Sequence, residues 1–198
     1  MKKEKCLIYT YGAPVLRQKA KCVTVFDENL KTFAKGMLRD MYTAQGIGLA
    51  APQAGKAIQL VVIDLQQKES EEQVFLDGRS LPIALVQPLF LVNPTWRPAH
   101  DLKVEKEEGC LSLPDVRGNV KRFFEIILEY CDLDGNAHRL QCRDLLARCI
   151  QHECDHLNGI LFIDHLSKKE RNEQRELLDE IKAFGGTFDY AEEAEATV

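Results

Sequence analysis

The sequence predicts one domain of the α+β class over residues 1–198. Three apolar, strand-like segments lie in the middle of the chain, at residues 58–65, 83–94 and 123–133. Helical periodicity is found on both sides of this region, over about residues 28–44 and again from residue 144 onwards. A chain of 198 residues is long enough to form one domain with its own hydrophobic core.

The first predicted helix covers about residues 28–44 and follows Asp27, which can cap its N-terminus. Its apolar residues recur at helical spacing and should face the core: Leu30, Phe33, Ala34, Met37, Leu38 and Met41. After the first strand, the polar segment 66–80 is expected to be a surface loop. Asp134-Gly135 predicts a turn directly after the third strand.

The second predicted helix covers residues 144–158, and Gly159 is placed to end it. One face of this helix carries Leu145, Cys149, His152 and His156. A third, highly charged helix should follow Ser167 and end near Gly185, with an apolar face that packs from one side only. That face consists of Leu177, Leu178, Ile181 and Phe184. Residues 185–198 are expected to be a frayed acidic tail.

The composition argues against several classes of protein. With 45% hydrophobic and 29% charged residues, the chain is neither disordered nor fibrous. A net charge of −5 gives no electrostatic footprint for DNA. We find no signal peptide and no apolar run of about 18 residues, so we expect neither secretion nor a membrane span. Seven irregularly spaced cysteines do not form a disulfide framework, which favours a reducing cytoplasm.

The second predicted helix contains an HExxH motif, His152-Glu153-Cys154-Asp155-His156. Four residues advance an α-helix by about 6 Å and about 400°, so both imidazoles project from one face and can bind a single cation. Glu153 can then reach a water on that cation. The alternative is a pair of surface histidines on a helix.

Several residues could supply the third metal ligand. Phe162 occupies the position where a metzincin-like continuation would need a histidine, so that option fails. Glu173 and Glu176 are acidic candidates in a charged run whose plain interpretation is a solvated helix face. Cys149 is about 10 Å of helix rise from the second histidine, and packing in the core is the better interpretation for it. Cys110, in EGCLSLP, remains, although a buried free cysteine is the commoner explanation for such a residue.

A small and nearly uncharged segment, GIGLAAPQ at residues 46–53, follows the first helix. Its glycines allow a ligand to approach the backbone closely. The alternative is a tight connection into the strand at residues 58–65.

Three segments together resemble the motifs of peptide deformylase, in the same order and at similar spacing: GIGLAAPQ (46–53), EGCLSLP (108–114) and QHECDHLNG (151–159). The resemblance covers about residues 7–168 and includes YGAPVLRQKA (11–20) and LFIDHLS (161–167). It implies mostly antiparallel strands packed around a central HExxH helix, with an N-terminal and a C-terminal helix. It also implies a metal-dependent hydrolase of protein biosynthesis, which removes the N-formyl group from the formyl-methionine of newly synthesised polypeptides.

By this resemblance the metal ligands are Cys110, His152 and His156. A hydroxide on the metal would attack the formyl carbon while Glu153 moves the proton to the leaving amine. Gln53 and the backbone N–H of Leu111 would stabilise the oxyanion. The residues expected to bind substrate are Gly46, Ile47, Gly48, Glu108, Gly109, Leu145 and Cys149. Leu145 and Cys149 share the histidine face of the helix, so they should border an apolar pocket for methionine; packing in the core is the alternative.

The resemblance also implies one divalent metal ion, ferrous iron in the cell, although two imidazoles and a thiolate also suit zinc, nickel and cobalt. The implied partners are N-formylmethionyl peptides, nascent chains and the ribosome, in the bacterial cytoplasm or an organelle. We expect a monomer without DNA or membrane partners. Arg117 and Arg122 match basic positions near the family's site, and exposed salt bridges are the alternative.

Two other functions stay open on the residues alone. An HExxH endopeptidase with Glu176 as third ligand would keep its metal in a Cys110→Ala variant. A structural Cys/His zinc module would need a fourth ligand, and no further cysteine or histidine is suitably placed by motif.

Overall fold

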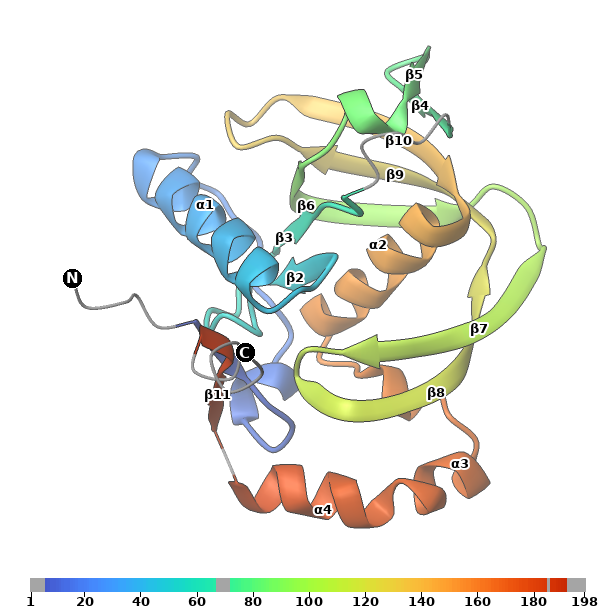
Figure 1. Ribbon diagram of the computed structural model, residues 1–198. Helices are drawn as coiled ribbons and strands as arrows, with labels where there is room; N and C mark the ends of the chain where they lie inside the picture. Colours follow the sequence, from blue (N-terminus) through green and yellow to red (C-terminus); the bar gives the residue numbers. More distant parts are fainter. Residues whose placement is uncertain (1–5, 67–71, 185, 192–198) are drawn as a thin grey trace.

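The computed structural model describes residues 6–66, 72–184 and 186–191, and it confirms the α+β class. Helix α2 (Asp144–Leu157) lies in the middle of the molecule, and strands surround it on several sides (Figure 1). Eleven of its 14 residues are buried, so α2 is enclosed almost all round and does not bury a single face. Gly159 ends the helix with a positive φ of 72°, as expected.

Seven strands form the main sheet, in the spatial order β2-β3-β6-β9-β10-β4-β5, and all neighbouring pairs are antiparallel. Along the chain these strands are β2 (Gly48–Ala50), β3 (Leu60–Ile63), β4 (Gln73–Leu76), β5 (Arg79–Pro82), β6 (Leu89–Pro98), β9 (Glu125–Cys131) and β10 (Ala137–Arg143). A cluster of buried apolar side chains lies between this sheet and α2. The predicted antiparallel arrangement around the HExxH helix is therefore confirmed.

Two smaller antiparallel pairs contain the other strands of the described residues. β7 (Lys103–Cys110) and β8 (Leu113–Phe123) form a long hairpin that curves around the other side of α2 (Figure 1). β1 (Leu7–Tyr9) pairs with β11 (Thr187–Asp189), which joins the two ends of the described chain. Short 3-10 helices lie at Pro14–Arg17, Ile83–Leu85 and Phe162–Asp164.

Helix α1 (Glu28–Thr43) forms as the sequence predicts. The Asp27 carboxylate accepts a hydrogen bond from the backbone N–H of Leu30 at 2.9 Å. Leu30, Ala34, Met37 and Met41 are buried in a second apolar cluster that includes residues of β2 and β3, and Phe33 and Leu38 pack partly buried against it. The helix therefore covers the β2–β3 edge of the main sheet.

The surface loop expected at residues 66–80 is wrong for the part that the structure describes. Residues 73–82 form the β4–β5 hairpin, and Val74 is fully buried. Asp77 and Gly78 both have positive φ, at 51° and 80°, as a tight hairpin turn requires. Asp77-Gly78 is a turn signal in the sequence, but the polar residues around it do not show the apolar pattern that predicts strands. Residues 67–71 lie outside the described part of the chain.

The strand limits differ from the predicted ones as well. The segment 83–94 starts as a 3-10 helix, and β6 begins only at Leu89 and continues to Pro98. Strands β7, β8 and β10 were not predicted. The turn at Asp134-Gly135 is confirmed, with φ of 86° at Gly135.

The C-terminal helix is divided in two: α3 (Lys168–Glu173) and α4 (Arg175–Phe184). The Ser167 hydroxyl accepts a hydrogen bond from the Glu170 N–H, and the Ser167 N–H donates to the Glu170 carboxylate, which confirms the predicted start of α3. Leu178 is buried in a third apolar cluster, together with Val116 of β8 and Phe162, and Leu177 and Ile181 pack partly buried against this cluster. Phe184 is 70% exposed, so its assignment to the apolar face is wrong.

The frayed tail expected from residue 185 is also wrong where the structure describes it. β11 pairs with β1 from Leu7 to Tyr9, and Ala191 is only 8% exposed. Residues 187–190 are all partly buried. Residues 185 and 192–198 lie outside the described part. Within the described ranges, no helix is long and apolar enough to cross a membrane.

Replacing Asp27 with alanine should lower the free energy of unfolding by about 1 kcal/mol, because the Leu30 N–H loses its acceptor. Urea denaturation measures the change. As a control, Asp179→Ala removes an exposed carboxylate of α4 and should change stability by less than about 0.5 kcal/mol. Equal effects of the two substitutions would contradict the assigned cap.

Candidate metal centre

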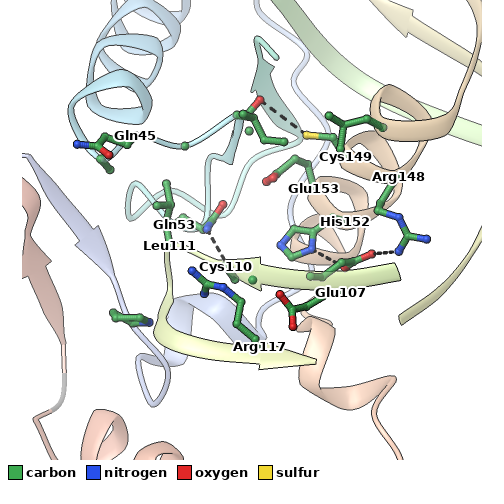
Figure 2. A pocket seen from close by; sticks show the side chains of 18 of the residues that line it. Gln45, Gln53, Glu107, Cys110, Leu111, Arg117, Arg148, Cys149, His152 and Glu153 are labelled. Carbon is green, nitrogen blue, oxygen red and sulfur yellow. Dashed lines mark hydrogen bonds and ion pairs between the residues drawn. The ribbon is translucent and has the colours of Figure 1, made fainter. Parts of the chain in front are cut away.

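Three side chains from two elements meet at the centre of the molecule. Cys110 is the last residue of β7, whereas His152 and His156 project from α2 (Figure 2 shows the first two). One ligand atom from each lies within 4.8 Å of the other two, and Cys110 Sγ is 3.2 Å from His156 Nε2. Among the described residues, this is the one group of three or more such side chains placed to hold a metal ion.

The chemistry of these side chains fits a divalent cation. Burial lowers the pKa of the His156 imidazole well below its usual range, so the ring is neutral and has a lone pair to donate. His152 uses Nδ1 to contact Glu108 Oε2 at 2.9 Å, which leaves its other ring nitrogen for the site. One thiolate and two imidazoles make a set of three protein ligands, and such a set leaves a coordination position open.

The other ligand candidates are not part of this group. Glu173 and Glu176 are exposed on α3 and α4, so an endopeptidase site with Glu176 as third ligand is wrong. Cys149 is buried one turn before His152, and burial raises the pKa of its thiol well above the usual value. A structural zinc module would need a fourth cysteine or histidine ligand. Within the described ranges, no such residue lies in this group.

Glu108 is the centre of a buried charge network. Arg122 contacts both of its carboxylate oxygens at 3.0 Å, and Arg148 donates to Oε1 at 2.6 Å. Burial alone would raise the pKa of Glu108, but the hydrogen bonds from His152 and Arg122 outweigh this effect and hold that pKa well below its usual range. Glu108 is therefore a carboxylate that fixes the orientation of His152.

Arg122 and Arg117 have different surroundings. Arg122 is 6% exposed and also pairs with Asp155, so the interpretation of an exposed salt bridge is wrong for it. Arg117 is exposed and lines the pocket in front of the metal centre.

Glu153 is 4% exposed and faces the site from α2 (Figure 2). Burial raises the pKa of its carboxyl to about 7. Its Oε2 has no hydrogen-bond partner among the described residues. A carboxyl group that is half ionised near neutral pH is suited to accept and release a proton.

Gly48 allows β2 to approach these side chains closely. A Cβ atom at this position would lie 2.5 Å from Glu153 Oε1 and 2.8 Å from Cys149 Sγ, which is closer than such atoms can come. Any side chain at residue 48 would therefore displace Glu153. At Gly48 the close neighbours are therefore two side chains of α2, and the expected approach of a ligand to this backbone stays a prediction.

A hydrogen bond from the end of β2 fixes the side-chain amide of Gln53. Its Oε1 accepts a hydrogen bond from the Ala50 N–H at 2.8 Å, which turns Nε2 towards Cys110 Sγ at 3.6 Å and Ser112 Oγ at 3.1 Å (Figure 2). Gln53 is 1% exposed, so its amide is fixed in one orientation.

A cavity of about 620 Å³ lies in front of the centre. It is lined by all the residues expected to act on or bind substrate, which are Gly46, Ile47, Gly48, Gln53, Glu108, Gly109, Leu111, Leu145, Cys149 and Glu153. Arg148 and Tyr190 also line it, and the sequence did not indicate them: Arg148 looks like one more charged helix residue, and Tyr190 lies in the segment expected to fray.

Comparison with known proteins gives a consistent result. Residues 5–172 match the model of the family described as polypeptide deformylase. The peptide deformylase of Opitutus terrae is 48% identical over 165 residues, which are 83% of this chain and 86% of that protein. The peptide deformylase of Brucella suis is 45% identical over 159 residues, or 80% and 83% of the two chains.

Solved structures agree with this match. A peptide deformylase from Synechococcus elongatus in complex with actinonin has a TM-score of 0.72 and 42% identity, covering 87% of this chain and 84% of that one. A peptide deformylase from Legionella pneumophila has a TM-score of 0.73 and 37% identity, covering 89% and 95%.

Cys110→Ser should weaken the binding of a soft divalent metal, because a hydroxyl group replaces the thiolate. Cys149→Ser and Cys154→Ser should keep about one ion per chain, as a single three-ligand site requires. Metal analysis after dialysis against a chelator measures the difference. The ligand assignment is wrong if Cys149→Ser loses the metal while Cys110→Ser retains it.

Proposed function

The chain belongs to the peptide deformylase family of hydrolases, which remove the N-formyl group from polypeptides, and we propose that its substrate is the formyl-methionine of newly synthesised chains. The observation that carries this proposal is the neighbourhood of the metal centre. Glu153 and the Gln53 amide face the same cavity as Cys110, and the Leu145 and Cys149 side chains border it.

Cys110, His152 and His156 would hold the divalent cation. When bound, such a cation activates a water at neutral pH and stabilises negative charge on a carbonyl oxygen. We propose ferrous iron as the metal in the cell, since a soft thiolate with two imidazoles suits it; the same set also accepts zinc, nickel or cobalt.

Glu153 is the proton carrier in this proposal. Its carboxylate takes the proton of the attacking water and delivers it to the nitrogen of the leaving amine. The pKa of about 7 and the unpartnered Oε2 support this role, because the group can change its protonation state without breaking a hydrogen bond at that oxygen.

Gln53 and Leu111 stabilise the oxyanion that forms from the formyl oxygen. The Gln53 Nε2 group is already directed into the site by the bond between its Oε1 and Ala50. The backbone N–H of Leu111 would be the second donor, since Leu111 follows the ligand Cys110 directly and lines the cavity. A fixed donor of this kind contributes about 100- to 1,000-fold in kcat.

The substrate backbone would lie between β2 and β7. Gly46, Ile47 and Gly48 offer backbone groups from one side, and Glu108 and Gly109 offer them from the other. The Glu108 carboxylate is engaged with Arg122, Arg148 and His152, so this residue would contact substrate through its backbone only. Leu145 and Cys149 would contact the methionine side chain.

We propose that the chain acts as one monomeric domain on nascent chains at the ribosome, in a bacterial-type cytoplasm or an organelle. All seven cysteines are free thiols, which suits a reducing compartment. The Synechococcus elongatus relative was solved with actinonin, and we expect the same inhibitor to occupy the cavity of this chain.

An anaerobic assay of formate release from formyl-Met-Ala, with metal analysis of the same sample, tests the proposal. The unaltered chain should release formate. Glu153→Ala should keep its metal and fold but lose nearly all turnover, because Glu153 moves protons and is not a ligand. Loss of the metal from this variant, or full activity in it, would overturn the assigned role.

Enlarging Cys149 to leucine should raise KM for formyl-Met peptides more than for formyl-Ala peptides, because the added carbons fill the space that the methionine side chain needs. Changes of this size in an apolar pocket alter discrimination by about 1 to 3 kcal/mol. Steady-state kinetics on both substrates measure the effect, with metal content and melting temperature as controls. Equal effects on the two substrates would assign Cys149 to the core and not to the pocket.

A further inference from the structure

The segment at residues 186–191 reaches the metal centre from the other end of the chain. β11 (dark red in Figure 1) pairs with β1, and the Tyr190 N–H continues the contact by donating to the Cys6 carbonyl at 3.1 Å. The Tyr190 ring packs edge-to-face on Phe188, with ring centroids 4.8 Å apart. Tyr190 is thereby held at the wall of the cavity, which it helps to line.

The Tyr190 hydroxyl contacts the backbone beside a metal ligand. It donates a hydrogen bond of 2.6 Å to the carbonyl oxygen of Leu111. That carbonyl and the N–H of Ser112 belong to the same peptide group, and the Ser112 N–H points at Cys110 Sγ, 3.4 Å away. One peptide group therefore connects Tyr190 to the sulfur of the metal ligand.

A peptide group is planar, so its carbonyl and its N–H turn together. A bond that fixes the Leu111 oxygen therefore also fixes the direction of the Ser112 N–H. The next carbonyl, that of Ser112, accepts a bond from the Tyr11 N–H at 2.8 Å. The turn that carries Leu111 is thus held at two successive carbonyl groups, one by a side chain and the other by backbone.

The hydrogen bond from Tyr190 also changes the charge distribution in the Leu111–Ser112 peptide group. A donor on the carbonyl polarises the peptide group and strengthens the donation from its own N–H. The acceptor of that N–H is the sulfur that would bind the cation, and hydrogen bonds to a ligand atom tune a metal site.

We propose that Tyr190 is a positioning residue for the deformylation reaction. Its hydroxyl holds the Leu111–Ser112 peptide group so that the Ser112 N–H stays on Cys110 Sγ and the neighbouring Leu111 N–H faces the formyl oxygen. The second half of this inference rests on the proposed role of the Leu111 N–H as oxyanion donor.

The test is Tyr190→Phe, which removes the hydroxyl and keeps the ring, in comparison with Tyr130→Phe on β9, which removes a tyrosine hydroxyl outside the cavity. In the zinc-loaded proteins, the NMR signals of the Leu111 and Ser112 amides should shift and their hydrogen exchange should accelerate in Tyr190→Phe only. The kcat for formyl-Met-Ala should fall roughly 3- to 10-fold while KM changes less than about 2-fold, as expected for one lost hydrogen bond. A second variant, Phe188→Ala, loosens the Tyr190 ring and should give a smaller change at the same two amides.

Unchanged Leu111 and Ser112 amides in Tyr190→Phe, or an effect confined to KM, would overturn the inference while leaving the deformylase assignment intact. A failure of the unaltered chain to release formate would instead count against the proposed reaction, and the amide signals would still decide whether Tyr190 positions this peptide group. Equal effects of Tyr190→Phe and Tyr130→Phe would reduce Tyr190 to a general contribution to stability.

Discussion

The architecture of the metal centre depends on one buried carboxylate, that of Glu108. It lies where the β7–β8 hairpin crosses α2, and it contacts Arg122 of the hairpin and Arg148 and His152 of the helix. Glu108, Arg122 and Arg148 are each less than a tenth exposed, so their charges are largely removed from solvent and compensate one another. Removing the Glu108 carboxylate would leave Arg148 without its buried counter-charge, and breaking a buried pair in this way costs about 3 to 5 kcal/mol. The carboxylate therefore fixes the hairpin on the helix, and for this reason Cys110 at the end of β7 lies beside the histidines.

The helical framework and part of the metal centre could be predicted from the sequence, because both follow from short-range patterns. Asp27 and the apolar spacing after it define α1 within one residue of its observed end. The HExxH spacing alone brings His152 and His156 to one face of α2. Cys110 is a different case: the residues by themselves left it as one candidate among several, and only the order of the three motifs distinguished it.

The features that could not be predicted depend on contacts between residues far apart in the chain. β7 has the sequence KVEKEEGC, whose side chains are mostly exposed, and it is a strand because it pairs with β8 along its whole length. Arg148 and Tyr190 have no local signal, because their partners Glu108 and Leu111 are 40 and 79 positions away. Position in the fold also decides which polar atoms stay unsatisfied. Gln151 on α2 bonds the backbone of Phe123 through both ends of its amide, whereas Glu153 Oε2 has no hydrogen-bond partner in the part of the chain that the structure describes.

The pairing of β1 with β11 has a consequence for the order in which the molecule is assembled. A ribosome makes Leu7 long before Asp189. β1 therefore has no partner strand until β11, near the end of the described chain, has been synthesised. Contacts of such wide sequence separation form late in folding, because the loop-closure entropy must be overcome first. The hydroxyl of Tyr190 reaches Leu111 only after that step, by which time the Cys110 hairpin and α2 have both been translated. Formation of the contact between Tyr190 and the turn beside Cys110 is thus coupled to translation of the segment that follows α4.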